Sequence, residues 1–476
     1  MEQHLYLSLA ASFEKQIAGG LLKAGEKLPS IRKVSALYGV SKNTVIQAYL
    51  TLESRSLIIS RPQSGFYVGS GVDFRLPVPD KSQPSALSAH QEADGLIGKV
   101  FQQLTNTRIT QLSLSVPAPS FLPISKLNKC LSKAMLNLPS GGTGYGDIQG
   151  NMRLRSLISK RAFTWGGDLD SGDLVITAGV MNAISFALMA LTKPGDSVAV
   201  ESPVYYGMLQ LAKHLGLRVI ELPTHPLEGI DLQALETILP DLNALLLVTN
   251  FNNPLGSSMP EDRKKKLVEM ITANQVPLIE NDLYGEVYFG EKRPKPCKAF
   301  DQQGWVLWCG SFSKTLAPGY RVGWIAPGRY LRQVLRQKAF HSLSSTTLTQ
   351  EAVAEFMENG GYDKHLVTLR KRLFSNREHF IQSIGAYFPE GTKVSRPQGG
   401  FVLWIECHRS INTAKLYEAA MAQGISIAPG RMFTLQDQFH HCMRLSFGLD
   451  WNERLEQKLQ LLGKLVSEFT SPNEPS

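Results

Sequence analysis

The chain has 476 residues, of which 43% are hydrophobic and 19% are charged. This length accommodates about two to four domains, and the composition excludes a wholly disordered chain. No run of about 18 or more apolar residues is present, so no membrane span is expected. The amino terminus lacks the pattern of a secretory signal, and the five cysteines are scattered without a Cys-x-x-Cys spacing. We therefore expect a cytoplasmic protein without disulfides or a metal site.

The formal net charge of +9 is concentrated near the amino terminus. Residues 1–70 hold eight basic and four acidic residues, an excess of four, and the other 406 residues carry the remaining five. Such an excess favours a polyanion as partner, although many basic surfaces are merely solvated. Charge alone leaves both interpretations open.

The amino-terminal segment has the pattern of three short helices and a hairpin. Apolar residues recur at helical spacing over residues 5–17, and Ser30 and Ser41 are suited to cap two further helices joined at Gly39. Two β-rich runs flank residues 61–65, which predicts a hairpin. A second helix with polar and basic residues at its start is typical of a DNA-binding domain that uses the major groove. A small helical interaction domain is the alternative.

The same segment resembles the winged helix-turn-helix domain of the GntR family, and this resemblance covers almost all of residues 5–69. It is carried by four stretches, namely residues 25–32, 39–45, 48–53 and 64–68. The resemblance implies that residues 1–70 form a domain that binds double-stranded DNA. The residues that it places against the groove or the phosphates are Arg32, Ser41, Lys42, Asn43, Thr44 and Gln47, with Gly65 at the tip of the wing.

Residues 71–110 are expected to link two domains. Between about residues 71 and 94 the chain is rich in proline, serine and polar residues, and it shows neither helical nor strand periodicity. The alternative to a flexible linker is an ordered strap that lies on a domain surface.

From residue 111 onward, short apolar runs alternate with amphipathic helical stretches. Five runs have the composition of buried strands, and they begin at Leu174, Ser197, Ala244, Pro277 and Trp305. Apolar strands separated by helices predict a parallel or mixed sheet that is covered on both faces, so the expected fold class is α/β. The last residues, 469–476, are expected to form a flexible tail.

A lysine with hydroxyl and guanidinium neighbours follows the last of these runs. Lys314 lies beside Ser311 and Ser313, and Arg321 stands seven residues farther along the chain. Loops at the carboxyl ends of strands bind ligands in α/β sheets, and these residue types suit a Schiff base next to a phosphate. A surface loop rich in serine and lysine is the alternative for this segment in isolation.

Polar and aromatic residues also follow the other predicted strands. Asp282 ends the fourth run and is suited to accept a hydrogen bond from a protonated pyridine nitrogen. Asn253 and Tyr284 are suited to hold a phenolic oxygen, and Tyr205 is suited to stack on a ring. Residues 177–183 turn from a strand into a helix, whose first amides bind anions. All of these residues stand at the ends of predicted strands, and this shared position favours a pyridoxal phosphate site.

Together these segments resemble the fold-type I aminotransferases over residues 111–468. The resemblance implies a mostly parallel central sheet, a smaller carboxy-terminal α/β subdomain and pyridoxal 5′-phosphate as cofactor. It implies that Lys314 forms the internal aldimine, that Lys314 and Asp282 carry catalysis, and that Arg444 binds the α-carboxylate of a substrate or effector. Tyr145 would reach the phosphate of a neighbouring protomer, which implies a homodimer. The residues that it assigns to the cofactor are Lys314, Asp282, Asn253, Tyr284, Tyr205, Gly179, Val180, Met181, Ser311, Ser313, Arg321 and Tyr145. Met181 stands at a position where these aminotransferases frequently have a polar residue.

A winged helix joined to an aminotransferase-like domain resembles the MocR/GabR group of bacterial regulators. The resemblance implies a transcription regulator that binds promoter DNA and senses a small amine or amino acid through an aldimine at Lys314. Two alternatives remain open. The cofactor itself can be the effector, or the protein can be a working aminotransferase with a secondary DNA-binding head, since a lysine able to move a proton is present.

Overall fold

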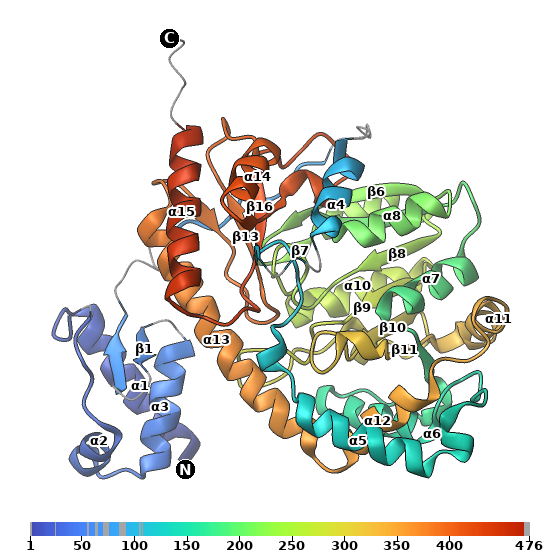
Figure 1. Cartoon of the computed structure of the whole chain (residues 1–476), viewed down its shortest axis with the longest axis horizontal. Helices are drawn as coiled ribbons and strands as arrows, with labels where there is room; N and C mark the ends of the chain where they lie inside the picture. Colours follow the sequence, from blue (N-terminus) through green and yellow to red (C-terminus); the bar gives the residue numbers. More distant parts are fainter. Residues whose placement is uncertain are drawn as a thin grey trace.

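The computed structural model describes residues 2–23, 25–54, 57–61, 65–69, 76–84, 92–103, 106 and 108–470. Figure 1 shows a small amino-terminal domain beside a large α/β body. The two parts meet where Tyr6 donates a hydrogen bond of 2.8 Å to the carboxylate of Glu291. None of the helices in these ranges is both long enough and apolar enough to cross a membrane.

The amino-terminal domain has the three predicted helices and the predicted hairpin. These elements are α1 (Glu2–Ala18), α2 (Ile31–Tyr38), α3 (Lys42–Ser54), β1 (Ile58–Arg61) and β2 (Gly65–Val68), and the two strands pair antiparallel. Ser30 caps α2 by accepting the Lys33 amide, and Ser41 caps α3 by accepting the Thr44 amide. Gly39 adopts a φ of 63° and ends α2. The caps therefore fix the turn between the two helices.

The described part of the body is built on an eight-stranded sheet with the order β4-β11-β10-β9-β8-β5-β6-β7. The run from β10 to β6 is parallel, whereas β4, β11 and β7 pair antiparallel with their neighbours. The strands are β4 (Val175–Thr177), β5 (Ser197–Ser202), β6 (Arg218–His225), β7 (Gly229–Ile230), β8 (Ala244–Leu247), β9 (Leu278–Asn281), β10 (Val306–Ser311) and β11 (Gly323–Ala326). This mostly parallel sheet confirms the predicted fold class.

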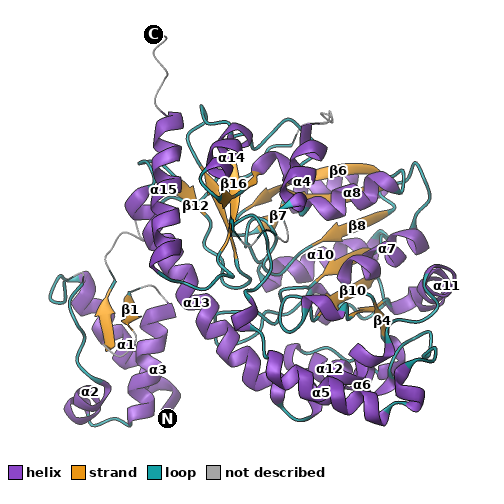
Figure 2. Ribbon diagram, in the orientation of Figure 1, coloured by secondary structure: helices purple, strands orange, loops and turns teal. Residues whose placement is uncertain are grey.

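Helices cover both faces of the sheet (Figure 2). On one face α7 (Val180–Leu191) and α8 (Tyr206–His214) pack on side chains that include Ile279 of β9. On the opposite face α9 (Leu232–Ile238) and α10 (Glu261–Ala273) pack on side chains that include Leu278. Neighbouring residues of β9 therefore point to opposite faces, as the pleat of a strand requires.

A second, four-stranded sheet forms the smaller carboxy-terminal subdomain. Its strands, in the order β12-β13-β16-β15, are β12 (Lys393–Val394), β13 (Val402–Glu406), β16 (Cys442–Ser446) and β15 (Ala428–Pro429). Further α-helices and strands of the body are α5 (Ile124–Asn137), α6 (Met152–Ala162), α11 (Leu331–His341), α12 (Thr347–Glu358), α13 (Gly361–Tyr387), α14 (Thr413–Ala422), α15 (Glu453–Thr470), β3 (Thr110–Gln111) and β14 (Ile425–Ser426). Most of the predicted tail, residues 471–476, lies outside the described residues.

The segment predicted as a linker is ordered where the structure describes it. Residues 76–84 form a strap along the body, in which the Val394 amide donates to Pro77 and the Asp80 amide donates to the Glu406 carboxylate, both at 2.9 Å. The Thr224 amide donates to Ser82 at 2.7 Å. Farther along, helix α4 (Glu92–Gln102) was not predicted. Its buried Leu96, Ile97 and Val100 attach it to the body.

Candidate cofactor and ligand site

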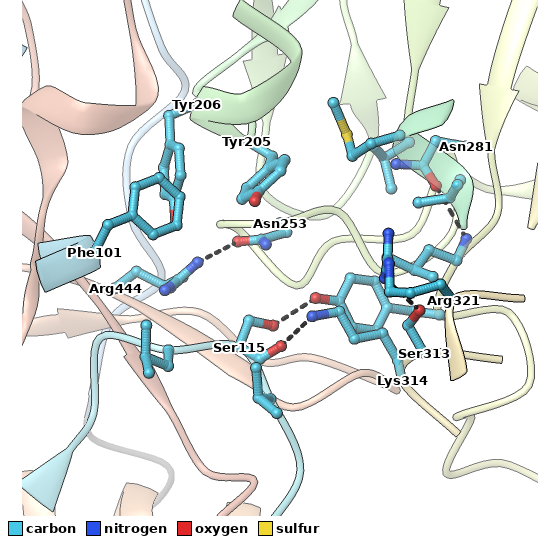
Figure 3. A pocket seen from close by; sticks show the side chains of 17 residues that line it. Phe101, Ser115, Tyr205, Tyr206, Asn253, Asn281, Ser313, Lys314, Arg321 and Arg444 are labelled. Atoms are coloured by element: carbon cyan, nitrogen blue, oxygen red, sulfur yellow. Dashed lines mark hydrogen bonds between the residues drawn. The ribbon is translucent and has the colours of Figure 1, made fainter. Parts of the chain in front are cut away.

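A cavity of about 230 Å³ lies at the carboxyl ends of the central strands. Figure 3 shows that side chains from loops far apart in the sequence converge on it. The predicted residues that line it are Val180, Met181, Tyr205, Asn253, Tyr284, Ser313, Lys314, Arg321 and Arg444. These residues follow five different strands or belong to β16, so the parallel sheet brings them together at one edge.

Lys314 lies in the loop after β10 and points its amine into the cavity (Figure 3). The amine donates a hydrogen bond to the carbonyl of Ser115. Burial lowers the pKa of Lys314 to about 7, and the positive charges of Arg444 and Arg321 add to this effect. A large fraction of the amine is therefore uncharged at neutral pH, which is the form that acts as a nucleophile.

Arg321 and the amino terminus of α7 form a cationic end of the cavity. The Arg321 guanidinium donates to the Ala178 carbonyl at 3.0 Å and to the Ser313 hydroxyl at 3.3 Å. Gly179 precedes α7 with a φ of 89°, and a Cβ atom there would lie 2.5 Å from the Arg321 guanidinium. Ser311 does not line the cavity, because its hydroxyl bonds to Ser313 and to the Val322 carbonyl at 2.9 Å. The arrangement suits a phosphate.

Arg444 contributes a second, fully buried cation. One of its terminal nitrogens donates to the side-chain oxygen of Asn253 at 3.0 Å, and the other donates to the carbonyl of Ser113. Its Nε has no hydrogen-bond partner among the described residues, and burial lowers the pKa of Arg444. A buried guanidinium that meets only neutral oxygens is suited to a carboxylate ligand.

Aromatic residues form the remaining walls. The rings of Tyr205 and Tyr206 lie 4.5 Å apart, and Phe101 of α4 packs edge-on against Tyr206 at 5.6 Å. Tyr284 shares a hydrogen bond with the Ser115 hydroxyl, and burial raises the pKa of Tyr284. Phe101, Ser115 and Tyr206 were not predicted. The sequence offered a signal only for Tyr206, because it directly follows the predicted Tyr205.

Asp282, which was expected to pair with the pyridine nitrogen, does not line the cavity. Its carboxylate forms an ion pair with Arg293 and accepts hydrogen bonds from Trp308 Nε1 at 2.9 Å and Asn250 Nδ2 at 3.0 Å. Asn281 lines the cavity in its place. The reason is the pleat of β9, since Ile279 and Asn281 point to the α7 face and Leu278 and Glu280 to the other.

Tyr145 also lies away from the cavity of its own chain. It is 87% exposed, between α5 and α6. Exposed Leu136, Ile148 and Met152 belong to the same part of the body. Any contact of Tyr145 with a cofactor phosphate therefore requires a second copy of the chain.

The predicted DNA contacts divide into exposed and buried residues. Arg32 at the start of α2 and Lys42 at the start of α3 are exposed, as are Ser41 and, in β2, Gly65. Thr44 is buried, contrary to expectation, and its hydroxyl shares a hydrogen bond with Ser41 at 2.8 Å. It therefore supports the cap of α3. Asn43 and Gln47 lie within α3, but their side chains are not among those that the structure describes.

Each of the two parts of the chain matches a known protein family. Residues 5–68 match the gntR family of bacterial regulatory proteins, and residues 109–456 match the aminotransferase class I and II family. YdcR and YjiR from Escherichia coli, both named uncharacterized HTH-type transcriptional regulators, are each 36% identical over 97% of this chain, and the matches cover 99% and 98% of those proteins. The body resembles a Pyrococcus horikoshii kynurenine aminotransferase, with a TM-score of 0.73 and 28% identity over 80% of this chain and 95% of the other. The chain therefore belongs to the aminotransferase class I and II family, whose cofactor is pyridoxal phosphate, and carries a gntR-family domain ahead of it.

Proposed function

We propose that the protein is a DNA-binding transcription regulator that holds pyridoxal phosphate in this cavity and responds there to a small amine or amino acid. One observation carries the proposal. Three basic residues, Lys314, Arg321 and Arg444, converge on one cavity in a chain that also has a winged helix. Arg321 suits the phosphate of one molecule and Arg444 suits the carboxylate of another, which leaves Lys314 between the two. Such a regulator would act in the cytoplasm, where it meets DNA.

The residues of the cavity fit the cofactor. Arg321, Ser313 and the first amides of α7 would bind its phosphate, and the space that a Cβ atom at Gly179 would fill is needed for that approach. When bound, pyridoxal phosphate supplies an aldehyde carbon that reacts reversibly with primary amines. Lys314 would provide such an amine in its uncharged form, and Tyr205 would stack on the ring.

The effector would be recognised by Arg444 together with the aromatic wall. Arg444 would bind a carboxylate through its guanidinium, and its contact with Asn253 would orient it. Phe101 and Tyr206 would face the effector side chain. Because Phe101 belongs to α4, an effector that contacts it would favour one position of the segment that leads to the DNA-binding domain.

The DNA-binding domain would use its exposed basic residues, and the body would form a homodimer. Arg32 and Lys42 would contact DNA from the starts of α2 and α3, and Gly65 would support the wing. Tyr145 would complete the cofactor site of the partner subunit. The two DNA-binding domains of one dimer would bind two half-sites of the target DNA.

The test is a gel-shift assay of the full-length protein on its own upstream DNA, with pyridoxal phosphate and a panel of amino acids and amines. We expect specific binding, and we expect one class of amine to change the affinity. The Lys314→Ala variant should still bind DNA but should not respond to the amine. Absence of specific binding under every condition would refute the regulator.

The same samples test the two alternatives. A response to pyridoxal phosphate without any amine would identify the cofactor as the effector. Repeated release of keto acid from an amino acid, with a keto acid as acceptor, would identify a working aminotransferase. This last alternative has support in Lys314, whose lowered pKa suits proton transfer.

A further inference from the structure

The charges around the cavity are all of one sign. Among the described residues that line it, Lys314, Arg321 and Arg444 are basic and none carries a carboxylate. This distribution suits the phosphate and the carboxylate of the two ligands proposed above. It also means that the ring nitrogen of a bound pyridoxal phosphate would meet no acid on the cavity wall.

The nearby carboxylates are held on the opposite face of β9. Asp282 is paired with Arg293, which also donates to Glu286 at 3.0 Å. Glu280 accepts hydrogen bonds from the amides of Cys297 and Lys298 at 2.6 and 3.0 Å. Turning either carboxylate into the cavity would break these bonds and leave buried donors without partners, so neither replaces the missing acid.

Asn281 occupies the cavity wall instead, and its orientation is fixed by the chain. The Leu283 amide donates to the side-chain oxygen of Asn281 at 3.2 Å, which leaves the side-chain NH₂ group with hydrogens to donate. The nearest partner of that group is the weakly accepting sulfur of Met208, at 3.8 Å. The group is therefore available as a hydrogen-bond donor, and a donor favours an acceptor opposite it.

We infer that Asn281 faces the cofactor's ring nitrogen and, as a donor, keeps that nitrogen unprotonated, so that the site binds amines reversibly without removing their α-proton. Removal of that proton would leave its electron pair on the α-carbon for the ring to accept, while Lys314 takes the proton. An unprotonated ring accepts electrons poorly, since a carboxylate on the pyridinium is what makes it an electron sink. This inference rests on the cofactor binding proposed above, and it explains why a sensor would keep its ligand unchanged.

The decisive measurement is ¹⁵N NMR of full-length protein loaded with pyridoxal phosphate labelled at the ring nitrogen. We expect an unprotonated nitrogen in the wild type at neutral pH and a protonated one in Asn281→Asp. The matched control is Asn274→Asp, which adds the same charge at the exposed end of α10, away from the cavity, and should leave the nitrogen unprotonated. A protonated nitrogen in the wild type overturns the inference, and this result does not depend on any variant.

A second measurement follows the α-proton directly. L-Alanine is incubated with each protein in D₂O, and the loss of its α-proton signal is recorded. We expect Asn281→Asp to exchange this proton at least about tenfold faster than the wild type. Equal rates would overturn the inference even when the gel shift supports the regulator. A protein that binds no pyridoxal phosphate overturns both the inference and the proposed cofactor site, whereas DNA binding is scored separately.

Discussion

Arg444 acts on the cavity in two ways, as a binding group and as a charge. It lies close enough to Lys314 to help lower the pKa of the amine, and it carries a buried nitrogen without a partner. These two effects separate when the charge is removed but the shape is kept.

We predict that Arg444→Gln raises the pKa of Lys314, because a like charge near the amine is lost. Affinity for L-alanine should fall by about 1.5–3 kcal/mol, the strength of a hydrogen bond to a charged group, whereas affinity for ethylamine should change little. Both are measured by titrating the visible band of the lysine-linked cofactor with each amine. An equal loss for both amines would contradict the assignment of Arg444 to the carboxylate.

Gly179 allows the amino terminus of α7 to approach Arg321. We predict that Gly179→Ala weakens the binding of pyridoxal phosphate, because a Cβ atom there meets the guanidinium and a φ of 89° strains an alanine by about 1–3 kcal/mol. The control is Gly172→Ala, where a Cβ atom meets nothing within 4 Å. Cofactor retention after dialysis measures the difference. Unchanged retention in Gly179→Ala would remove α7 from the phosphate site.

The attachment of the strap of residues 76–84 depends on pH through Glu406. Burial alone would raise the pKa of Glu406, but hydrogen bonds from His441, Lys393 and the Asp80 amide bring it down to about 2. A carboxyl with a lowered pKa stabilises the folded state above its unfolded pKa, and that contribution disappears as the pH falls toward 2. The anchor of the strap is thus intact at neutral pH and weakens only in acid.

We predict that Glu406→Gln loosens the strap at neutral pH, since Lys393 then loses its buried partner and the Asp80 amide a charged acceptor. The free energy of unfolding should fall by about 1–3 kcal/mol. Amide hydrogen exchange should increase in peptides that cover residues 76–84. The control Glu418→Gln alters an ion pair with Lys99 whose side chains are both more than half exposed, so it should have little effect.

The elements around the site could be predicted to different degrees. The strand ends could be predicted because parallel strands place the loops that follow them at one edge, and Lys314, Tyr205 and Asn253 accordingly meet. Asn281 was missed because β9 is buried on both faces, so its sequence shows no alternation that reveals which residues face the cavity. Helix α4 was missed because it follows a polar, proline-rich stretch, and its apolar residues are stabilised by contacts with the distant body.

At the scale of the whole molecule, the exposed apolar residues of the body point to self-association. Leu136 is 86% exposed and Tyr145 is 87% exposed, which is unusual for side chains of this size in one region of a monomer. We predict a homodimer in solution, and we predict that Leu136→Glu produces monomers with weaker cofactor binding. Leu21→Glu, at a residue of the DNA-binding domain that is 77% exposed, is the control and should stay dimeric. Sedimentation velocity distinguishes these outcomes.

The strap also limits how far each DNA-binding domain can travel. With residues 76–84 bonded to the body, the tether from Gly69 to Leu76 is seven residues long, and seven fully extended residues span at most about 25 Å. A flexible linker over the whole of residues 71–110 would have allowed the DNA-binding domain to lie much farther from the body. In the proposed homodimer the geometry of the target DNA is therefore set by the body, and half-sites placed beyond the reach of both tethers can be occupied together only if the DNA bends.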